Sequence, residues 1–184
     1  RSAALYYDRH EVVEETLNIK FLEAAEALLK ENLTIHAMTD VTNGGIRGDA
    51  KEISYTAAVK LVFEEEKMKR LVNPRVLNML DDLEIDYLGV SIDALLIIAP
   101  QQEAEKISRV IREAGVAVDQ IGIVETGSGA YLRVDGQLSD FSPRFREAAY
   151  TPIKKAVGQD ATRDIEEMRA RVDLAARNAV EKKR

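Results

Sequence analysis

Apolar residues in the first part of the chain recur with the spacing of an amphipathic helix. Between residues 19 and 31 they fall three or four positions apart and so share one helical face. They are Phe21, Leu22, Ala25, Leu28 and Leu29. Asn32 favours an end to this helix. A short strand is predicted at 34–39, a turn at 41–45, and a second helix from about 45 to 55.

The middle of the chain predicts a strand, a charged segment and a helix. Residues 57–63 alternate in the way typical of a strand. The charged run 64–70 is interpreted as a solvated loop or a helical turn. Asn73 and Pro74 then favour a helix start, because Asn caps a helix and Pro is tolerated at its first position. This helix is predicted to end near Leu83.

The most apolar run of the chain lies between Ala94 and Ala99. We expect a central strand, covered on both faces and ended by Pro100. Asp93 precedes this run, and a charged residue is seldom buried without a partner. It lies either at the entrance to the strand, which we favour, or in the same cleft as Asp40.

The next segments predict a helix and a hairpin. Residues 101–114 show helical periodicity, and Gly115 ends the pattern. A strand is expected at 116–125 and another at 130–134. The segment Thr126-Gly127-Ser128-Gly129 joins them as a turn; it could also cradle a phosphate, although a hairpin explains it more simply.

The predicted order of elements indicates an α/β (α+β) fold around one mixed β-sheet flanked by helices. Residues 136–158 are interpreted as irregular surface, and 160–183 as an extra, long, charged C-terminal helix with a narrow apolar stripe. We divide the chain into a lead-in at 1–18, a main domain at 19–135 and a C-terminal extension at 136–184.

Composition excludes several classes of function. The 184 residues carry a formal net charge of −6, which disfavours nonspecific binding to nucleic acid. The chain has no cysteine, so disulfides, thiol catalysis and Cys-based zinc sites are excluded. No apolar run approaches a membrane span, and we expect a cytoplasmic protein without a nucleic-acid or membrane partner. The chain starts at Arg1, which we interpret as an excised domain or processed fragment.

The strongest site candidate is the turn from Asp40 to Gly45. A strand, a turn with two glycines and a helix would place backbone N–H groups where anions bind. Asp40 would repel a bare phosphate, but a Mg²⁺ ion bridging carboxylate and phosphate would remove that conflict. The simpler alternative is that Asp40 or Asn43 caps the helix while Gly44 and Gly45 only form the turn.

Other polar residues are interpreted as structural. His36 stands within a strand without a second metal ligand at a suitable spacing, and His10 is a weaker candidate still. The acidic groups around Asp81-Asp82 and Glu84/Asp86 are interpreted as solvated residues at a helix end.

The turn and its surroundings resemble the opening of the C-terminal domain in the aminoimidazole ribonucleotide (AIR) synthase-like superfamily. That superfamily includes AIR synthase, formylglycinamide ribonucleotide amidotransferase, selenophosphate synthetase, thiamine-monophosphate kinase and HypE. The resemblance rests on Ile35-His36-Ala37-Met38-Thr39-Asp40-Val41-Thr42-Asn43-Gly44-Gly45-Ile46 with Glu52 beyond. Later landmarks are the apolar strand 94–99 and the segment Gln120 to Val124. The pattern is most similar to the HypE and selenophosphate synthetase branches.

The resemblance implies a fold like the C-terminal domain of AIR synthase (PurM) and an ATP- and Mg²⁺-dependent phosphorylating or dehydrating activity, hence transferase or ligase chemistry. It implies a catalytic and metal-contacting role for Asp40. It also implies nucleotide or substrate contacts from Thr42, Asn43, Gly44 and Gly45. The implied partners are a small-molecule substrate, an N-terminal ATP-binding domain and a second copy in a homodimer, and the isolated domain would be inactive.

Two features depart from the HypE pattern. The chain lacks the terminal cysteine that carries the carbamoyl group in HypE, so that chemistry is not carried over. It ends instead in the charged segment 160–183. An alternative function is therefore a non-catalytic binding or assembly (maturation) module of a larger complex. A third is a structural dimer domain in which the Gly-Gly turn serves only the architecture.

Overall fold

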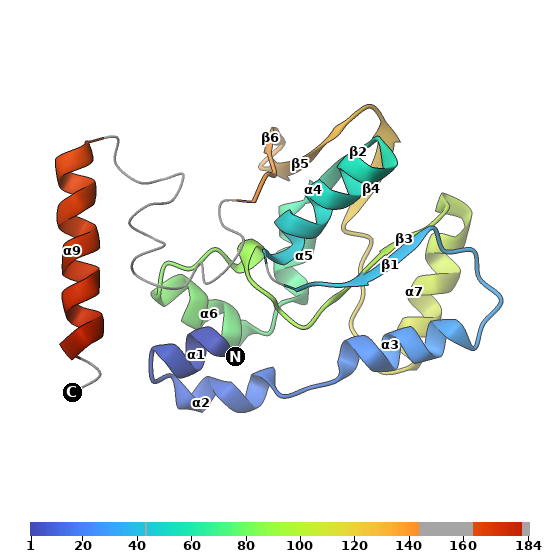
Figure 1. Ribbon diagram of the computed structural model, residues 1–184. Helices are drawn as coiled ribbons and strands as arrows, with labels where there is room; N and C mark the ends of the chain where they lie inside the picture. Colours follow the sequence, from blue (N-terminus) through green and yellow to red (C-terminus); the bar gives the residue numbers. More distant parts are fainter. Residues whose placement is uncertain (43, 144–163, 182–184) are drawn as a thin grey trace.

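The protein is an α+β domain in which helices flank two β-sheets (Figure 1). The computed structural model describes residues 1–42, 44–143 and 164–181. The predicted fold class and its mixed sheet are confirmed. The expectation of one sheet was wrong, because two of the strands form a separate sheet of their own.

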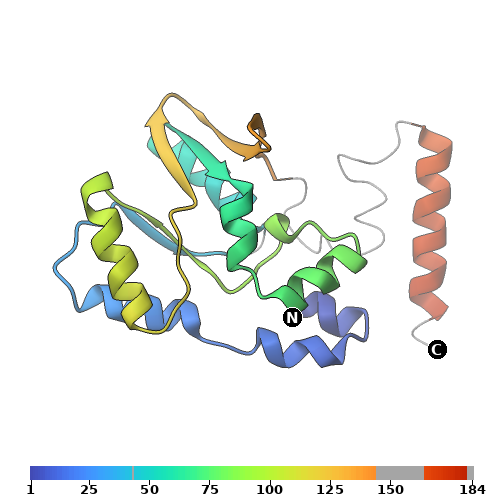
Figure 2. The ribbon, with the colours of Figure 1, turned by 180° about the vertical axis from the view of Figure 1, so that it is seen from behind.

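The N-terminal segment, for which the sequence pattern made no firm prediction, is helical. Its elements are α1 (Ser2–Tyr6), α2 (His10–Val13) and the 3₁₀ turn η1 (Glu14–Thr16). The predicted helix at 19–31 is α3 (Lys20–Leu29). Figure 2 shows α3 beside α7 (Ala104–Glu113), and the two helices pack through a small apolar core. That core consists of Ala24, Leu28, Ile107 and Ile111.

The smaller sheet consists of β1 (Ala37–Asp40) and β3 (Leu95–Ile98), which run antiparallel. The apolar run that predicted a central strand is therefore half of a two-stranded sheet. Its two faces are nevertheless covered. Leu96 belongs to the main core, whereas the neighbouring positions pack against the core between α3 and α7. The run is apolar because it serves two cores, not because it has two strand neighbours.

The larger sheet has the order β4-β2-β5-β6. Its strands are β2 (Val59–Glu64), β4 (Gly122–Thr126), β5 (Gly129–Val134) and β6 (Gln137–Asp140). The pair β2–β5 is parallel, and the other two pairs are antiparallel.

The predicted hairpin of strands 116–125 and 130–134 is wrong, because β2 lies between β4 and β5. The apolar strand β2 uses both of its edges: Leu61 pairs with Val124 on one side and with Ala130 on the other. The hairpin in the structure is β5–β6. Its second strand, β6, lies at the start of the segment 136–158, which was predicted to be irregular. The turn residues of this hairpin, Asp135 and Gly136, both have positive φ, 48° and 80°, as a tight two-residue hairpin requires.

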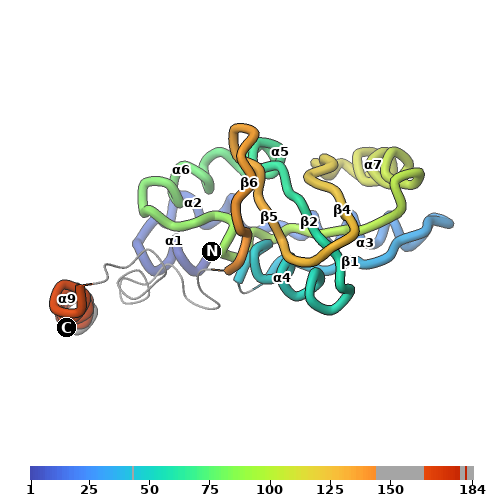
Figure 3. The backbone as a smooth tube through the Cα atoms, turned by 90° about the horizontal axis from the view of Figure 1, so that it is seen from above, coloured from blue at the N-terminus to red at the C-terminus, as the bar shows by residue number. Residues whose placement is uncertain are grey.

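Helices cover the larger sheet and complete the main core. They are α4 (Gly45–Ala57), α5 (Glu65–Leu71), α6 (Pro74–Asp82) and the short turn η2 (Tyr87–Gly89). A second short turn, η3 (Gln101–Glu103), leads into α7. The charged run 64–70 is thus mostly helical. The C-terminal helix α9 (Ile165–Glu181) lies apart from the other elements (Figure 3). Residues 160–163 and 182–184, which frame the predicted helix, lie outside the described residues.

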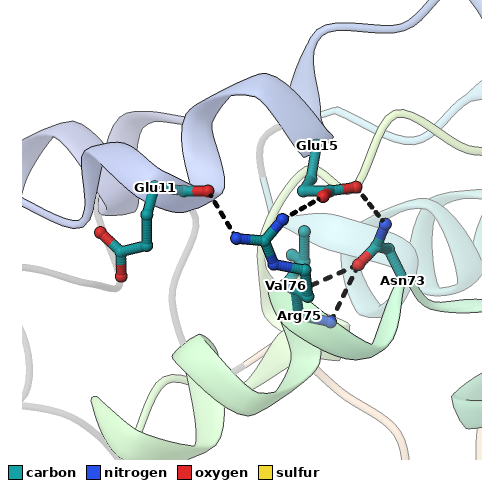
Figure 4. A network of polar contacts seen from close by, with 5 residues as sticks. All are labelled: Glu11, Glu15, Asn73, Arg75 and Val76. Atoms are coloured by element: carbon teal, nitrogen blue, oxygen red, sulfur yellow. Dashed lines mark hydrogen bonds and ion pairs between the residues drawn. The ribbon is translucent and has the colours of Figure 1, made fainter.

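The predicted start of α6 is confirmed. The Asn73 side chain accepts hydrogen bonds from the amides of Arg75 and Val76, and Pro74 occupies the first helical position. Figure 4 shows how this cap joins α6 to the N-terminal helices. The Arg75 guanidinium pairs with Glu15 at 2.6 Å, and the Asn73 amide donates to the same carboxylate at 2.9 Å.

No helix in the described part of the chain is long and apolar enough to cross a membrane.

Ser54 gives a test of the contact between α4 and the larger sheet. Its buried hydroxyl donates to the Val59 carbonyl at 2.7 Å and accepts from the Gly129 amide at 2.8 Å. Ser54→Ala removes both hydrogen bonds from a buried position, and we expect a loss of about 1–3 kcal/mol in the free energy of unfolding. Thr56→Ala, at an exposed position of the same helix, is the control. Equal values for the two variants in urea unfolding would contradict this assignment.

Candidate functional site

The Gly-Gly turn joins the end of β1 to the start of α4, as the sequence predicted. Gly44 is the N-cap residue, with a φ of 93° that favours glycine. The turn is closed by a hydrogen bond from the Gly45 amide to the Thr42 carbonyl at 2.9 Å. Thr42 is exposed, whereas Gly44 and Gly45 are buried. Asn43 lies outside the described residues.

Gly45 has a packing role that the sequence pattern did not reveal. A Cβ atom there would lie 2.3 Å from the Leu88 carbonyl oxygen and 2.6 Å from the Val90 nitrogen. The start of α4 therefore rests directly on the backbone of residues 88–90. Because the Gly45 amide is also used inside the turn, both the φ of 61° and the missing side chain have a structural cause. A ligand contact from Gly45 stays a prediction.

The N-terminus of α4 is not capped by Asp40. Gly44, the N-cap residue, has no side chain that could cap the helix, and Asp40 is exposed. The amides of Ile46 and Arg47 lie in the first turn of α4, where an α-helix provides no acceptor of its own. This helix end carries the partial positive charge of the helix dipole.

Three carboxylates influence one another beside this helix end. Asp49, on α4, has one carboxylate oxygen that is buried and lacks a hydrogen-bond partner among the described residues. Burial, and after it the nearby charges of Asp40 and Glu52, raises the pKa of Asp49 to about 6. The site therefore combines N–H donors with a concentration of negative charge that a cation would relieve.

The carboxylates near the turn fit a metal ion only if other ligands complete its coordination. Among the described residues, no three His, Cys, Asp or Glu side chains are grouped so that they could hold a metal ion. Mg²⁺, however, binds proteins through one or two carboxylates together with water and substrate phosphates. The carboxylates of Asp40 and Asp49 suit a Mg²⁺ ion that arrives with a phosphate ligand, and do not suit a resident metal cage.

A cavity of about 970 Å³ extends from the inner side of the turn toward the space between the two sheets. Val41, Gly44 and Ile46 line it near the turn, and Leu95 and Val124 line it farther along. Its size falls within the range of small-molecule sites.

Behind the turn lies a buried ion pair that the sequence pattern did not predict. The side chain of Arg47 is nine-tenths buried, and its Nε donates to the Asp86 carboxylate at 2.7 Å. The prediction that Asp86 is a solvated acid was therefore wrong. Asp86 also accepts from the Leu88 amide at 3.1 Å. The partners are 39 positions apart, and no local pattern could have revealed them.

The positions of His36, His10 and Asp93 agree with the simpler interpretation, whereas that of the Thr126–Gly129 segment does not. His36 and His10 are exposed, and His36 uses its backbone amide to pair with the Ile98 carbonyl at 2.8 Å. Asp93 lies just before β3, at the entrance to the strand, as favoured. The Thr126–Gly129 segment joins β4 to β5 across β2 and is not a hairpin turn.

Residues 2–135 match the family model described as AIR synthase related protein, C-terminal domain. The chain belongs to this family. The predicted recognition is thus confirmed.

Known proteins that resemble this AIR synthase-related domain include a sequence relative and several solved structures. Uncharacterized protein MJ1416 of Methanocaldococcus jannaschii is 48% identical over 185 residues, covering 99% of this chain and 40% of that protein. A crystal structure of the hydrogenase maturation protein HypE in complex with ATP superposes with a TM-score of 0.59 at 23% identity, covering 69% of this chain and 41% of that one. HypE in a crystal structure of the HypE–HypF complex superposes with a TM-score of 0.57 at 23% identity. This match covers 64% of this chain and 39% of that one.

These likenesses confirm the HypE-like fold of the domain. The chain spans about two fifths of the length of the proteins it matches. The titles name ATP and HypF as ligand and partner of HypE, not of this chain.

The raised pKa of Asp49 predicts how stability depends on pH. The folded state holds this proton more tightly than the unfolded state, whose pKa is near 3.8. The free energy of unfolding should therefore fall as the pH rises from about 4 to about 6. Asp49→Asn should remove this slope and raise stability at pH 7 by about 1 kcal/mol, after allowance for solvent screening.

The measurement is urea unfolding at several pH values, with the exposed carboxylate variant Asp81→Asn as control. A slope that persists unchanged in Asp49→Asn would show that this carboxyl is not its source.

Proposed function

We propose that this domain forms the substrate-side wall of a cleft in an ATP- and Mg²⁺-dependent enzyme that phosphorylates or dehydrates a small molecule. The observation that carries the proposal is the start of α4, a helix N-terminus after a Gly-Gly turn, together with the carboxylates of Asp40 and Asp49, whose charges influence each other. Free helical amides attract phosphate, and paired carboxylates attract the cation that accompanies it.

The proposed roles follow from where each group lies. The backbone around Gly44 and Ile46 binds phosphate oxygens, and the exposed Thr42 hydroxyl is available to the same ligand. Asp40, at the end of β1, contacts the Mg²⁺ ion or a substrate hydroxyl, and Asp49 adds a second oxygen ligand. Asn43 belongs to this proposal on the resemblance alone. ATP supplies the phosphoryl group.

Family membership and the greater length of the relatives support a second half of the cleft on another domain. The matching family model describes a C-terminal domain, and the ATP-bound HypE chain is more than twice as long as the part that this chain covers. We assign the second wall to an N-terminal ATP-binding domain, with a homodimer as the assembly. On this assignment the isolated domain is inactive.

Substitution of Asp40 tests the proposal. In the complete protein, Asp40→Asn should weaken Mg·ATP binding about tenfold or more, because a charge-assisted metal contact is lost. Isothermal calorimetry with and without Mg²⁺ measures the effect, and Asp81→Asn serves as the exposed carboxylate control. If the complete wild-type protein binds no ATP in the presence of Mg²⁺, the proposal fails.

A second candidate is an assembly module, favoured by the exposed apolar side chains of α9. Ile165 and Leu174 are 65% and 60% exposed. The likeness to HypE in a complex with HypF agrees with a role in assembly.

Removal of residues 164–184 separates the two candidates. If α9 serves assembly, the truncated protein should lose its oligomeric state in light scattering while it binds Mg·ATP as before. If the truncated protein keeps the same number of subunits as the complete protein, α9 is excluded as the assembly element.

A further inference from the structure

Arg47 occupies a position where a positive charge is unfavourable. It lies in the first turn of α4, beside the positive end of the helix dipole, and only 7% of the residue is exposed. A buried cation must be compensated by a charge and by hydrogen bonds. The contacts that compensate Arg47 come from two segments far away in the sequence.

The first compensating segment precedes η2. The Asp86 carboxylate accepts from Arg47 Nε through one oxygen and from the Leu88 amide through the other. The same carboxylate thus joins α4 to the backbone of residues 88–90. Gly45 packs against that backbone with no room for a Cβ atom. The turn and η2 are therefore joined by a close backbone contact and by an ion pair.

The second compensating segment follows β6. The guanidinium carbon of Arg47 lies 4.7 Å from the ring centroid of Phe141, in the range of a cation–π contact. Phe141 is fully buried, its amide donates to the Ala130 carbonyl at 2.9 Å, and its ring packs on Phe63 at 5.2 Å. Phe141 is thus fixed to the larger sheet, and Arg47 is fixed against Phe141.

We infer that Arg47 is a positioning residue for the Gly44–Gly45 turn. Through its contacts with Asp86 and Phe141 it fixes the position of the first turn of α4. It thereby also fixes the direction of the backbone amides that we propose to bind phosphate. The inference rests on the proposed function for its effect on ligand binding. Its effect on the order of the turn is independent of any ligand.

A purely structural ion pair would behave differently. Loss of such a pair lowers stability throughout the domain, whereas loss of a positioning contact also loosens the turn locally. Amide hydrogen exchange distinguishes the two, because local opening accelerates exchange in one segment only. The reference segment is α7, which packs in the separate core with α3.

The test compares Arg47→Lys with Arg75→Lys in the complete protein. Lysine keeps the charge but loses the planar guanidinium that bonds Asp86 and stacks on Phe141. Arg75 is the control, because its more exposed guanidinium also forms a short ion pair, at 2.6 Å, but joins α6 to the N-terminal helices. Phe141→Leu is the second variant; it keeps the ion pair and removes the aromatic face.

For Arg47→Lys we expect amide exchange at residues 48–51, whose amides have acceptors at the start of α4, to accelerate about tenfold relative to α7, and Mg·ATP affinity to fall about tenfold. Phe141→Leu should change both quantities in the same direction by a smaller factor. Arg75→Lys should change neither.

Two results would overturn the inference: exchange that accelerates equally in α4 and α7, or exchange and affinity that both stay at the wild-type level. Failure of the proposed function has a different signature, since wild-type protein would then bind no Mg·ATP. In that case the exchange data alone decide the role of Arg47.

Discussion

The direct contact between the start of α4 and the backbone of residues 88–90 determines most of the geometry around the turn. A single missing side chain, that of Gly45, makes this contact possible. Once the two segments touch, the first turn of α4 lies next to Asp86, and burial of Arg47 becomes tolerable because its partner is already in place. Because the start of α4 is held in place by these contacts, the orientation of the turn that follows β1 is also fixed.

The charge distribution around α4 follows from that fixed direction. Arg47 pairs with Asp86, which precedes η2, whereas Asp49, on the same helix, is influenced by the charges of Asp40 and Glu52. The positive group is neutralised inside the protein by Asp86. Among the described residues, one buried oxygen of Asp49 has no hydrogen-bond partner, so carboxylate charge remains near the N-terminus of α4. A ligand that carries both phosphate and a divalent cation satisfies both parts of this arrangement at once.

Local sequence patterns were sufficient to predict the elements whose structure depends on residues nearby in the sequence. The helices α3, α6 and α7 have clear periodicity or caps, and the strand–turn–helix at Asp40 to Gly45 has its own turn chemistry. Pairing between distant strands left no such signal. The apolar run at 94–99 looked like a central strand because it serves two cores, and the Gly-rich segment at 126–129 looked like a hairpin turn although β2 separates its flanking strands.

The position of β2 also has a consequence for how the chain folds. Its partners in the larger sheet, β4 and β5, follow it in the sequence by about sixty residues or more, and both are required to pair its edges. During synthesis β2 therefore emerges long before either partner, with its apolar residues and two unpaired edges exposed. Such non-local pairing slows folding and exposes a strand to wrong contacts. α4, which precedes β2 in the chain and packs against it, is the first element able to shield it.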